Sequence, residues 1–133
     1  MAFERVSSGA PWETTVGYCR ALRAGNMIFV TGTAPMNPDG SVHAPGDAYA
    51  QARRCFEIID RALRQLGADR SRLVRTRMYV TDITRHAEFG RAHREFVGEH
   101  RPCATMVGVS SLIDPAMLIE IEADAVIEDA SVP

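Results

Sequence analysis

Residues 118–127, Leu-Ile-Glu-Ile-Glu-Ala-Asp-Ala-Val-Ile, restrict the fold of this chain more than any other segment. Small or apolar residues alternate here with three carboxylates, Glu120, Glu122 and Asp124. Successive side chains of a β-strand point to opposite faces of a sheet, so the period of two predicts a strand with one buried and one charged face. Three carboxylates on one face repel each other unless cations or water lie close by. The chain must therefore form a sheet of which one face is not a core.

Two longer segments have the periodicity of amphipathic helices. In residues 47–67 the apolar side chains recur at steps of three and four, with Asp47 as the expected N-cap and Gly67 as the expected stop. Residues 81–100 carry a second apolar stripe, which includes His93. Each stripe must be buried against another element. We expect both helices to pack on the same face of the sheet.

Further strands are predicted before the last one, at residues 3–6, 18–24, 27–31 and 73–81, and the apolar segment 27–31 is expected to be a buried strand. In the last of these segments Val74, Met78 and Val80 are expected on one face, and Arg75, Arg77 and Tyr79 on the other. The order of strands, helix, strand, helix and strands predicts an α+β fold. A chain of 133 residues is long enough for one core and too short for two ordinary domains, so residues 1–133 are expected to form a single domain.

The face of the sheet opposite the helices would carry a mixture of charged and apolar side chains. Arginines on the predicted strands, Arg20, Arg23, Arg75 and Arg77, are candidate partners for the carboxylates. Such a face is too polar for a core and too apolar for a free surface. This combination is typical of a subunit interface with clefts.

Composition argues against several classes of protein. With 15 basic and 17 acidic residues, the formal net charge is -2, which gives no positive field to attract nucleic acid. The three cysteines are widely spaced, which suits a reducing cytoplasm better than a disulfide framework or a zinc site. No apolar segment suggests secretion or membrane insertion, and no glycine-rich phosphate loop is present. We therefore expect no metal, no cofactor and no membrane contact.

The C-terminal third carries a family signature. The run Arg101-Pro102-Cys103-Ala104-Thr105-Met106-Val107-Gly108-Val109, followed by residues 113–126, resembles that of the reactive-intermediate deaminase family, known as Rid, RidA-like or YjgF and also as endoribonuclease L-PSP. The resemblance spans nearly the whole chain. It implies a chorismate-mutase-like α+β domain with a mixed sheet, assembled as a homotrimer with three small-molecule clefts between subunits.

The resemblance also implies which residues line these clefts. Tyr18 matches the tyrosine that precedes the family's Gly-Asn step and packs over bound ligand, although an ordinary strand aromatic is an equal alternative. The run Thr31-Gly32-Thr33 matches a segment whose backbone amides lie close to ligand, and Gly32 allows such an approach because it has no side chain. Glu120 matches the glutamate that positions or activates the hydrolytic water, and the alternative is a strand carboxylate paired with Arg75 or Arg77. Glu122 is expected to have such an arginine partner.

One position departs from the family pattern. A Pro-x-Arg-[Ser/Thr] step normally supplies an arginine that holds the substrate carboxylate, and Ala104, followed by Thr105, stands at that position here. Loss of a bidentate charge-assisted pair costs on the order of 2 to 5 kcal/mol of binding free energy. Arg20 could in principle replace the missing arginine from across the cleft. Gly90 also stands where many relatives carry asparagine.

Cys103 is a weaker chemical candidate beside the predicted cleft. Its thiol would be a nucleophile if a histidine activated it. His93, however, lies on the apolar face of its helix, where a lone histidine is more often a core residue with a satisfied hydrogen bond than a catalytic base.

Two functions follow from these observations. The first is a cofactor-independent hydrolase of imines, enamines or related carbonyl-derived metabolites, with typical 2-imino acid deaminase activity opposed by Ala104. The second is a non-catalytic trimer that binds a small metabolite for regulation or sequestration. The endoribonuclease activity named for some relatives is disfavoured by the acidic strand face and the negative net charge.

Overall fold

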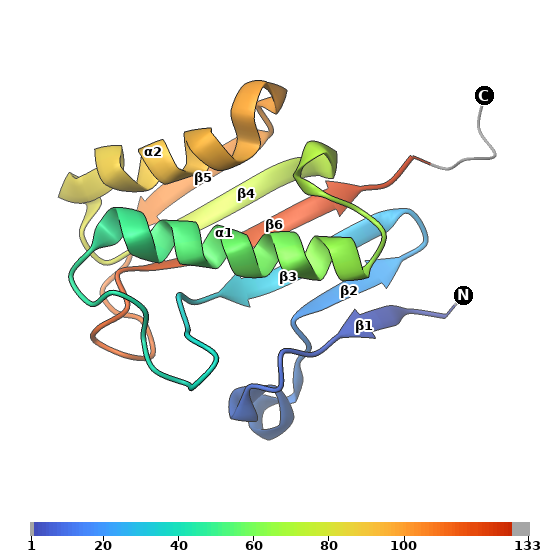
Figure 1. Ribbon diagram of the computed structural model, residues 1–133, viewed down its shortest axis with the longest axis horizontal. Helices are drawn as coiled ribbons and strands as arrows, with labels where there is room; N and C mark the ends of the chain where they lie inside the picture. Colours follow the sequence, from blue (N-terminus) through green and yellow to red (C-terminus); the bar gives the residue numbers. More distant parts are fainter. Residues whose placement is uncertain (1, 129–133) are drawn as a thin grey trace.

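The computed structural model describes residues 2–128 as a six-stranded β-sheet with two α-helices packed on one of its faces (Figure 1). The strands are β1 (Glu4–Val6), β2 (Ala21–Ala24), β3 (Met27–Thr33), β4 (Leu73–Val80), β5 (Cys103–Gly108) and β6 (Ile119–Val126), and the helices are α1 (Ala48–Gln65) and α2 (His86–Val97). Four short helical segments connect them: η1 (Glu13–Gly17), η2 (Arg70–Arg72), η3 (Ile83–Arg85) and η4 (Gly98–His100).

The strands are ordered β1-β2-β3-β6-β4-β5 across the sheet. Neighbouring strands are antiparallel except β4 and β5, which are parallel and are joined through α2. A parallel pair requires such a crossover connection. The mixed sheet and the α+β class predicted from the sequence are thereby confirmed.

Helix α1 begins and ends at the residues that the sequence indicates. The Asp47 carboxylate accepts a hydrogen bond from the Ala50 backbone N–H at 3.0 Å, which satisfies one of the free amide groups of the first turn. Gly67 follows the helix with a φ of 88°, a conformation that favours glycine. Between them the predicted apolar stripe is buried, with Cys55, Ile59 and Leu63 at 0% exposure.

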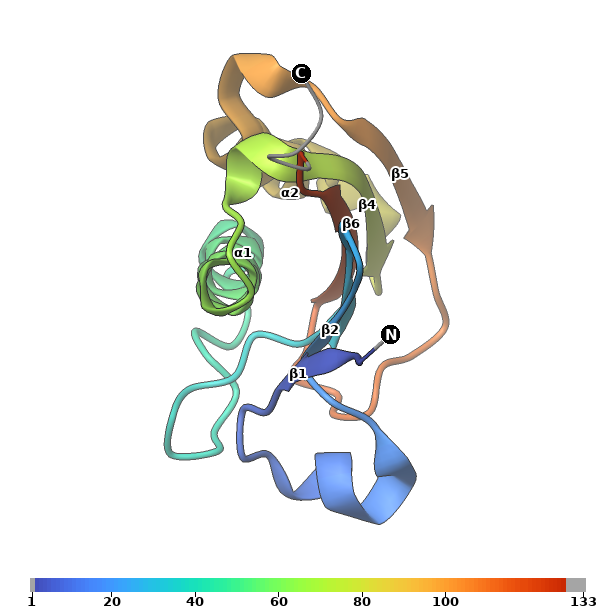
Figure 2. The same cartoon turned by 90° about the vertical axis from the view of Figure 1, so that its right-hand side faces the viewer.

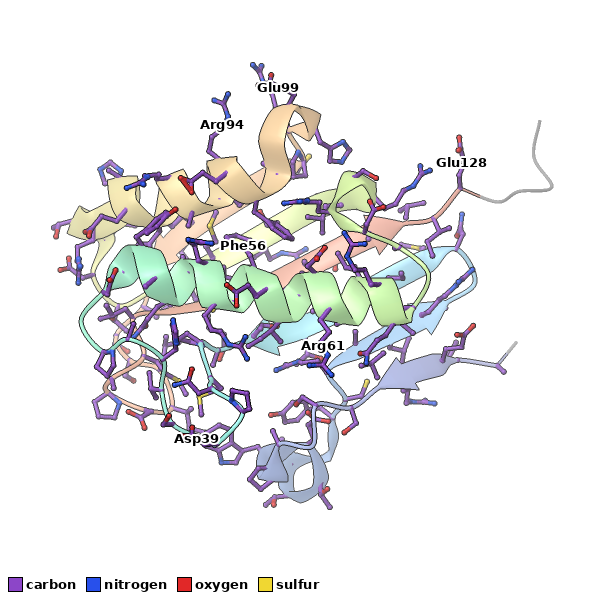
Figure 3. The ribbon with its side chains drawn as sticks, in the orientation of Figure 1. Asp39, Phe56, Arg61, Arg94, Glu99 and Glu128 are labelled. Atoms are coloured by element: carbon purple, nitrogen blue, oxygen red, sulfur yellow. The ribbon has the colours of Figure 1, made fainter. Side chains whose placement is uncertain are left out.

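The core lies between the two helices and the sheet, as the edge-on view in Figure 2 shows. Along β6 the small and apolar residues Ile119, Ile121, Ala123 and Ala125 are fully buried, while the alternating residues are half-buried on the other side. Phe56 of α1 reaches toward α2 and stacks on Phe96 with ring centroids 4.7 Å apart (Figure 3). The helices cover one face only, and we call the opposite face of the sheet the open face.

The structure corrects three details of the strand predictions. Val74 is 43% exposed rather than buried, because the register shifts between Leu73 and Arg75 and this irregularity turns Leu73 into the core instead. Residues 18–20 precede β2 and are not part of it. In β3, Met27 and Phe29 are exposed on the open face, so this strand is half-buried rather than wholly buried.

None of the helices within residues 2–128 is both long and apolar enough to cross a membrane.

Candidate functional site

Glu120 and Gly32 meet on the open face, at the end of β3. A methyl group added to Gly32 would lie only 2.6 Å from Glu120 Oε2 and 3.1 Å from Cδ, so the carboxylate rests directly against the glycine backbone. The side chain of any other residue at position 32 would displace it. The predicted glutamate and the predicted glycine are therefore parts of one site.

The Glu120 carboxylate is half-buried, and this burial raises its pKa above the ordinary value. The positive charge of Arg20 opposes the rise, and the negative charge of Glu122 adds to it. A carboxylate with a raised pKa is a better proton acceptor than an exposed one, provided that it is ionised at the working pH. The chemistry available at this position is general acid and base catalysis.

Arg20 binds the backbone of Gly32 through its side chain. Its guanidinium Nη2 donates a hydrogen bond to the Gly32 carbonyl at 2.7 Å, and only 9% of the residue is exposed. The guanidinium carbon lies 6.0 Å from the centre of the Tyr18 ring, within the range of a cation–π contact. Tyr18, Arg20, Gly32 and Glu120 thus form one connected group.

Tyr18 also lines an open groove of about 670 Å³ on the same face of the sheet. The remaining lining residues come from the first strands and the η1 segment: Arg5, Glu13, Gly17, Cys19, Leu22, Phe29 and Thr31. Apolar side chains with a few polar groups among them are typical of ligand-binding surfaces.

Thr31 and Thr33 contribute less than the resemblance implies. The Thr31 amide donates to the Arg20 carbonyl at 3.1 Å, and the Thr31 hydroxyl donates to the Cys19 carbonyl at 2.7 Å. Thr33 is fully buried, with its hydroxyl bonded to the Thr31 carbonyl. The Thr31 amide is therefore not free to bind a ligand. The backbone that remains available for ligand contact in this segment is that of Gly32, where the β3–β6 register shifts.

The other two carboxylates of β6 have protein partners. Asp124 forms an ion pair with Arg77 at 3.3 Å. Glu122 accepts a hydrogen bond from the Tyr79 hydroxyl, so its partner is a tyrosine and not an arginine as expected. No hydrogen bond or ion pair to the Glu120 carboxylate is present among residues 2–128. Glu120 is the carboxylate of this strand that remains available for chemistry.

Strand β5 carries the residues that the signature placed in the cleft. Ala104 pairs with Thr76, whose hydroxyl is bonded to His93 of α2, so Ala104 faces the helix side of the sheet. Cys103 and Thr105 alternate with it and share the open face. All three are exposed at the edge of the sheet.

Ala104 and Glu120 of one chain are therefore not neighbours. β4 separates their strands, a spacing of roughly 10 Å, and the two side chains point to opposite faces. The sequence order alone could not reveal this separation.

His93 is half-buried beside the core and has a satisfied hydrogen bond, as predicted for a structural histidine. Its Nε2 is 2.7 Å from the Thr76 hydroxyl, and its ring packs edge-on against Phe56. Burial lowers the pKa of His93 and thus favours the neutral form of the ring. Because His93 lies on the helix side and Cys103 on the open face, the structure does not bring them together as a catalytic pair. Within residues 2–128 no cluster of three or more His, Cys, Asp or Glu side chains could hold a metal ion.

Glu13 is a residue near the site that the sequence did not indicate. Only 7% of Glu13 is exposed, and its carboxylate accepts hydrogen bonds from Ser7 Oγ at 2.8 Å and from the Ser8 amide at 3.0 Å. Burial opposes ionisation, but the hydrogen bonds from Ser8 and Ser7 and the charge of Arg20 together lower the pKa of Glu13. No local sequence motif predicts that Glu13 is buried, because its hydrogen bonds depend on the chain reversal between Ser7 and Glu13.

The likeness to known proteins extends over nearly the whole chain. The family model described as Endoribonuclease L-PSP matches residues 9–127. The chain belongs to this family. The resemblance to Rid and YjgF proteins inferred from the signature is thus confirmed.

Individual relatives agree with this assignment. The crystal structure of Rv2704 from Mycobacterium tuberculosis, a member of the YjgF/YER057c/UK114 family, superposes with a TM-score of 0.86 at 43% identity, covering 95% of this chain and 100% of that one. An uncharacterized protein of Streptomyces coelicolor is 33% identical over 93% of this chain and 92% of its own. The 3-aminoacrylate deaminase RutC of Acinetobacter baylyi is 30% identical over 78% of this chain and 82% of its own.

Proposed function

We propose that this protein is a small-molecule hydrolase that acts on an imine, an enamine or a related carbonyl-derived metabolite. The observation that carries the proposal is the half-buried Glu120 carboxylate, which rests on Gly32 without a hydrogen-bonding partner among the described residues and has a raised pKa. The deaminase activity named for the RutC relative supports the same reaction class.

The chemistry requires only water and a proton carrier. Glu120 removes a proton from water while the water oxygen bonds to the imine carbon, and the C=N electron pair moves to nitrogen. The proton then passes from Glu120 to the nitrogen, which gives a carbinolamine. Glu120 next removes the hydroxyl proton and delivers it to the nitrogen, the oxygen electron pair forms the C=O bond, the C–N bond breaks, and ammonia and a carbonyl compound leave. An enamine enters the same sequence after protonation at carbon. Tyr18 and the Gly32 backbone shape the space in which the substrate lies.

We further propose that the sites form in clefts between the subunits of a homotrimer. Four apolar side chains on or beside the open face, Met27, Phe29, Val74 and Val107, are between 41% and 43% exposed, which favours coverage by another subunit. Trimer clefts would also allow Ala104 and Thr105 of one subunit to approach Glu120 of the next. The three cysteines are free thiols, which supports a reducing compartment such as the cytoplasm.

The second candidate is a non-catalytic trimer that binds a metabolite in the same clefts. Ala104 favours it, because the alanine offers no group to orient a carboxylate for reaction.

The deciding experiment compares the natural protein with Glu120→Gln on a panel of imines, enamines and small carbonyl compounds. For an enzyme, the amide should reduce turnover by roughly two to four decades while ligand affinity is retained. Ligand binding without turnover by the natural protein would establish the second candidate instead. An unchanged rate in a folded Glu120→Gln variant would remove Glu120 from the mechanism.

A further inference from the structure

Arg20 is a buried cation that is fixed in place by its backbone and its side chain. Its N–H donates to the Val6 carbonyl at 2.8 Å, and its carbonyl accepts from the Thr31 amide at 3.1 Å. The Nη2 bond to the Gly32 carbonyl adds a third fixed point. The guanidinium therefore has one orientation relative to Gly32, and hence relative to the Glu120 carboxylate.

The hydrogen-bonding capacity of this guanidinium is mostly unused. A guanidinium carries five N–H donors. Within residues 2–128 only Nη2 has a protein acceptor, and the buried Nε has none. No described carboxylate lies within ion-pair distance of Arg20, although Glu13 and Glu120 are near enough to be affected by its charge. Buried charges without a paired partner are rare, because the loss of hydration is not compensated.

The free donors of Arg20 lie among the proposed catalytic groups. The Tyr18 ring is 6.0 Å from the guanidinium carbon, and the Gly32 carbonyl that Arg20 binds belongs to the same residue on which Glu120 rests. Nη1 and the remaining hydrogen of Nη2 have no acceptor among the described residues, and guanidinium donors of this kind bind the oxygens of a planar carboxylate. The Nε donor is shielded from solvent and does not take part in such binding.

We propose that Arg20 anchors the carboxylate of the substrate and takes over the role for which Ala104 has no suitable group. This inference rests on the proposed function and specifies its substrate class: a small imine or enamine that carries a carboxylate. The anchor comes from the segment before β2, so the carboxylate approaches Glu120 from a different direction than an arginine on β5 would impose. Substrate preference therefore differs from that of relatives with the β5 arginine.

The test uses sodium 2-oxobutyrate as an unreactive carboxylate probe and 2-butanone as its neutral counterpart, both measured by titration calorimetry and by the shift of the Arg20 side-chain N–H signal. Arg20→Met should weaken 2-oxobutyrate binding by roughly 30-fold or more, because a charge-assisted bidentate pair is lost. Arg20→Lys keeps the charge without the planar pair of donors, so its affinity for 2-oxobutyrate should lie between those of the natural protein and Arg20→Met. The matched control Arg61→Met, on the exposed side of α1, should bind like the natural protein.

Each outcome separates the anchor from the enzyme. If the natural protein and Arg20→Met bind 2-oxobutyrate equally, or if the natural protein does not bind it, Arg20 is not the carboxylate anchor. A loss of 2-butanone binding that equals the loss of 2-oxobutyrate binding also overturns it, because it reports collapse of the pocket. Arg20-dependent binding without turnover of any imine sustains the anchor and removes the proposed hydrolase. Turnover whose KM is the same in Arg20→Met sustains the hydrolase and removes the anchor.

Discussion

At the centre of the candidate site the Glu120 carboxylate rests against the Gly32 backbone. Family signature and strand alternation indicate the two residues separately, and nothing local relates a position near the end of β3 to one near the start of β6. The 2.6 Å approach depends on the β3–β6 pairing and on its register shift after Val30. Arg20 was only one of four strand arginines considered as partners, and the structure singles it out by burial. Residue types were predictable here, whereas their neighbours were not.

Gly32→Ala tests this contact. The added methyl group would meet the end of a flexible side chain, so the protein should fold while the Glu120 carboxylate moves aside. A displacement of about 1 Å can cost on the order of 10²-fold in rate, and we expect a loss of that size in turnover. Combining Gly32→Ala with Glu120→Gln should add little to Glu120→Gln alone, because both act on one group. Fully additive losses in steady-state rates would show that Gly32 has a separate role.

The pH dependence of stability tests the charge state of Glu120. Because burial raises its pKa in the folded protein, the folded state binds more protons than the unfolded state between the ordinary and the raised value, and stability falls as pH rises through this window. Glu120→Gln removes this effect. Its melting temperature should equal that of the natural protein below about pH 4 and be the higher of the two above the window. A variant that is less stable than the natural protein above this window, but not below it, would mean that ionised Glu120 forms a stabilising ion pair.

At the scale of elements, the helices and β6 were predictable because their signals are local. The stripe of α1 lies between a capping Asp47 and the positive φ of Gly67, and the alternation in β6 follows from burial of a single face. The strand predictions are wrong at positions where the pairing between strands, and not the local sequence, determines the conformation. Val74 follows the period of two in the sequence but lies at a register shift. In residues 18–20 the Tyr18 amide bonds to the Glu13 carbonyl of η1, whereas the Arg20 amide and carbonyl bond to Val6 and Thr31, so the regular pairing of β2 begins only at Ala21.

The N-cap of α1 provides a prediction at this scale. Asp47→Ala removes the acceptor of the Ala50 amide and should lower the free energy of unfolding by about 1 kcal/mol, measured from urea denaturation curves. Asp47→Asn is the matched control, because asparagine caps helices about as well as aspartate. Equal losses in both variants would assign the effect to the charge of Asp47 and not to its hydrogen bond.

For the whole molecule, assembly determines whether position 104 can act in the site at all. Within one chain an arginine at position 104 would face the helix side, away from Glu120. In a trimer it could reach the cleft of a neighbouring subunit, so Ala104→Arg should increase hydrolysis of 2-iminobutyrate above that of the natural protein. Ala104→Gln, which lengthens the same side chain without a charge, is the matched control and should give no gain. If neither variant gains activity, the remaining site has also diverged from the family.

The open face is the surface through which we propose that the subunits associate. Phe29 is 42% exposed at the centre of a face that the helices leave uncovered, and burial of such side chains against a second subunit is favourable by roughly 25 cal/mol per Å². Light scattering after size exclusion should report about three chains for the natural protein, as expected for a closed assembly with threefold symmetry. Phe29→Asp should dissociate the assembly, because a carboxylate added beside Asp124 would be buried next to a like charge. Arg61→Asp, a larger change in charge on the exposed side of α1, should leave the trimer intact. If the natural protein is monomeric at micromolar concentration, both the proposed interface and the intersubunit clefts are refuted. Turnover by that monomer would place the entire site within one chain.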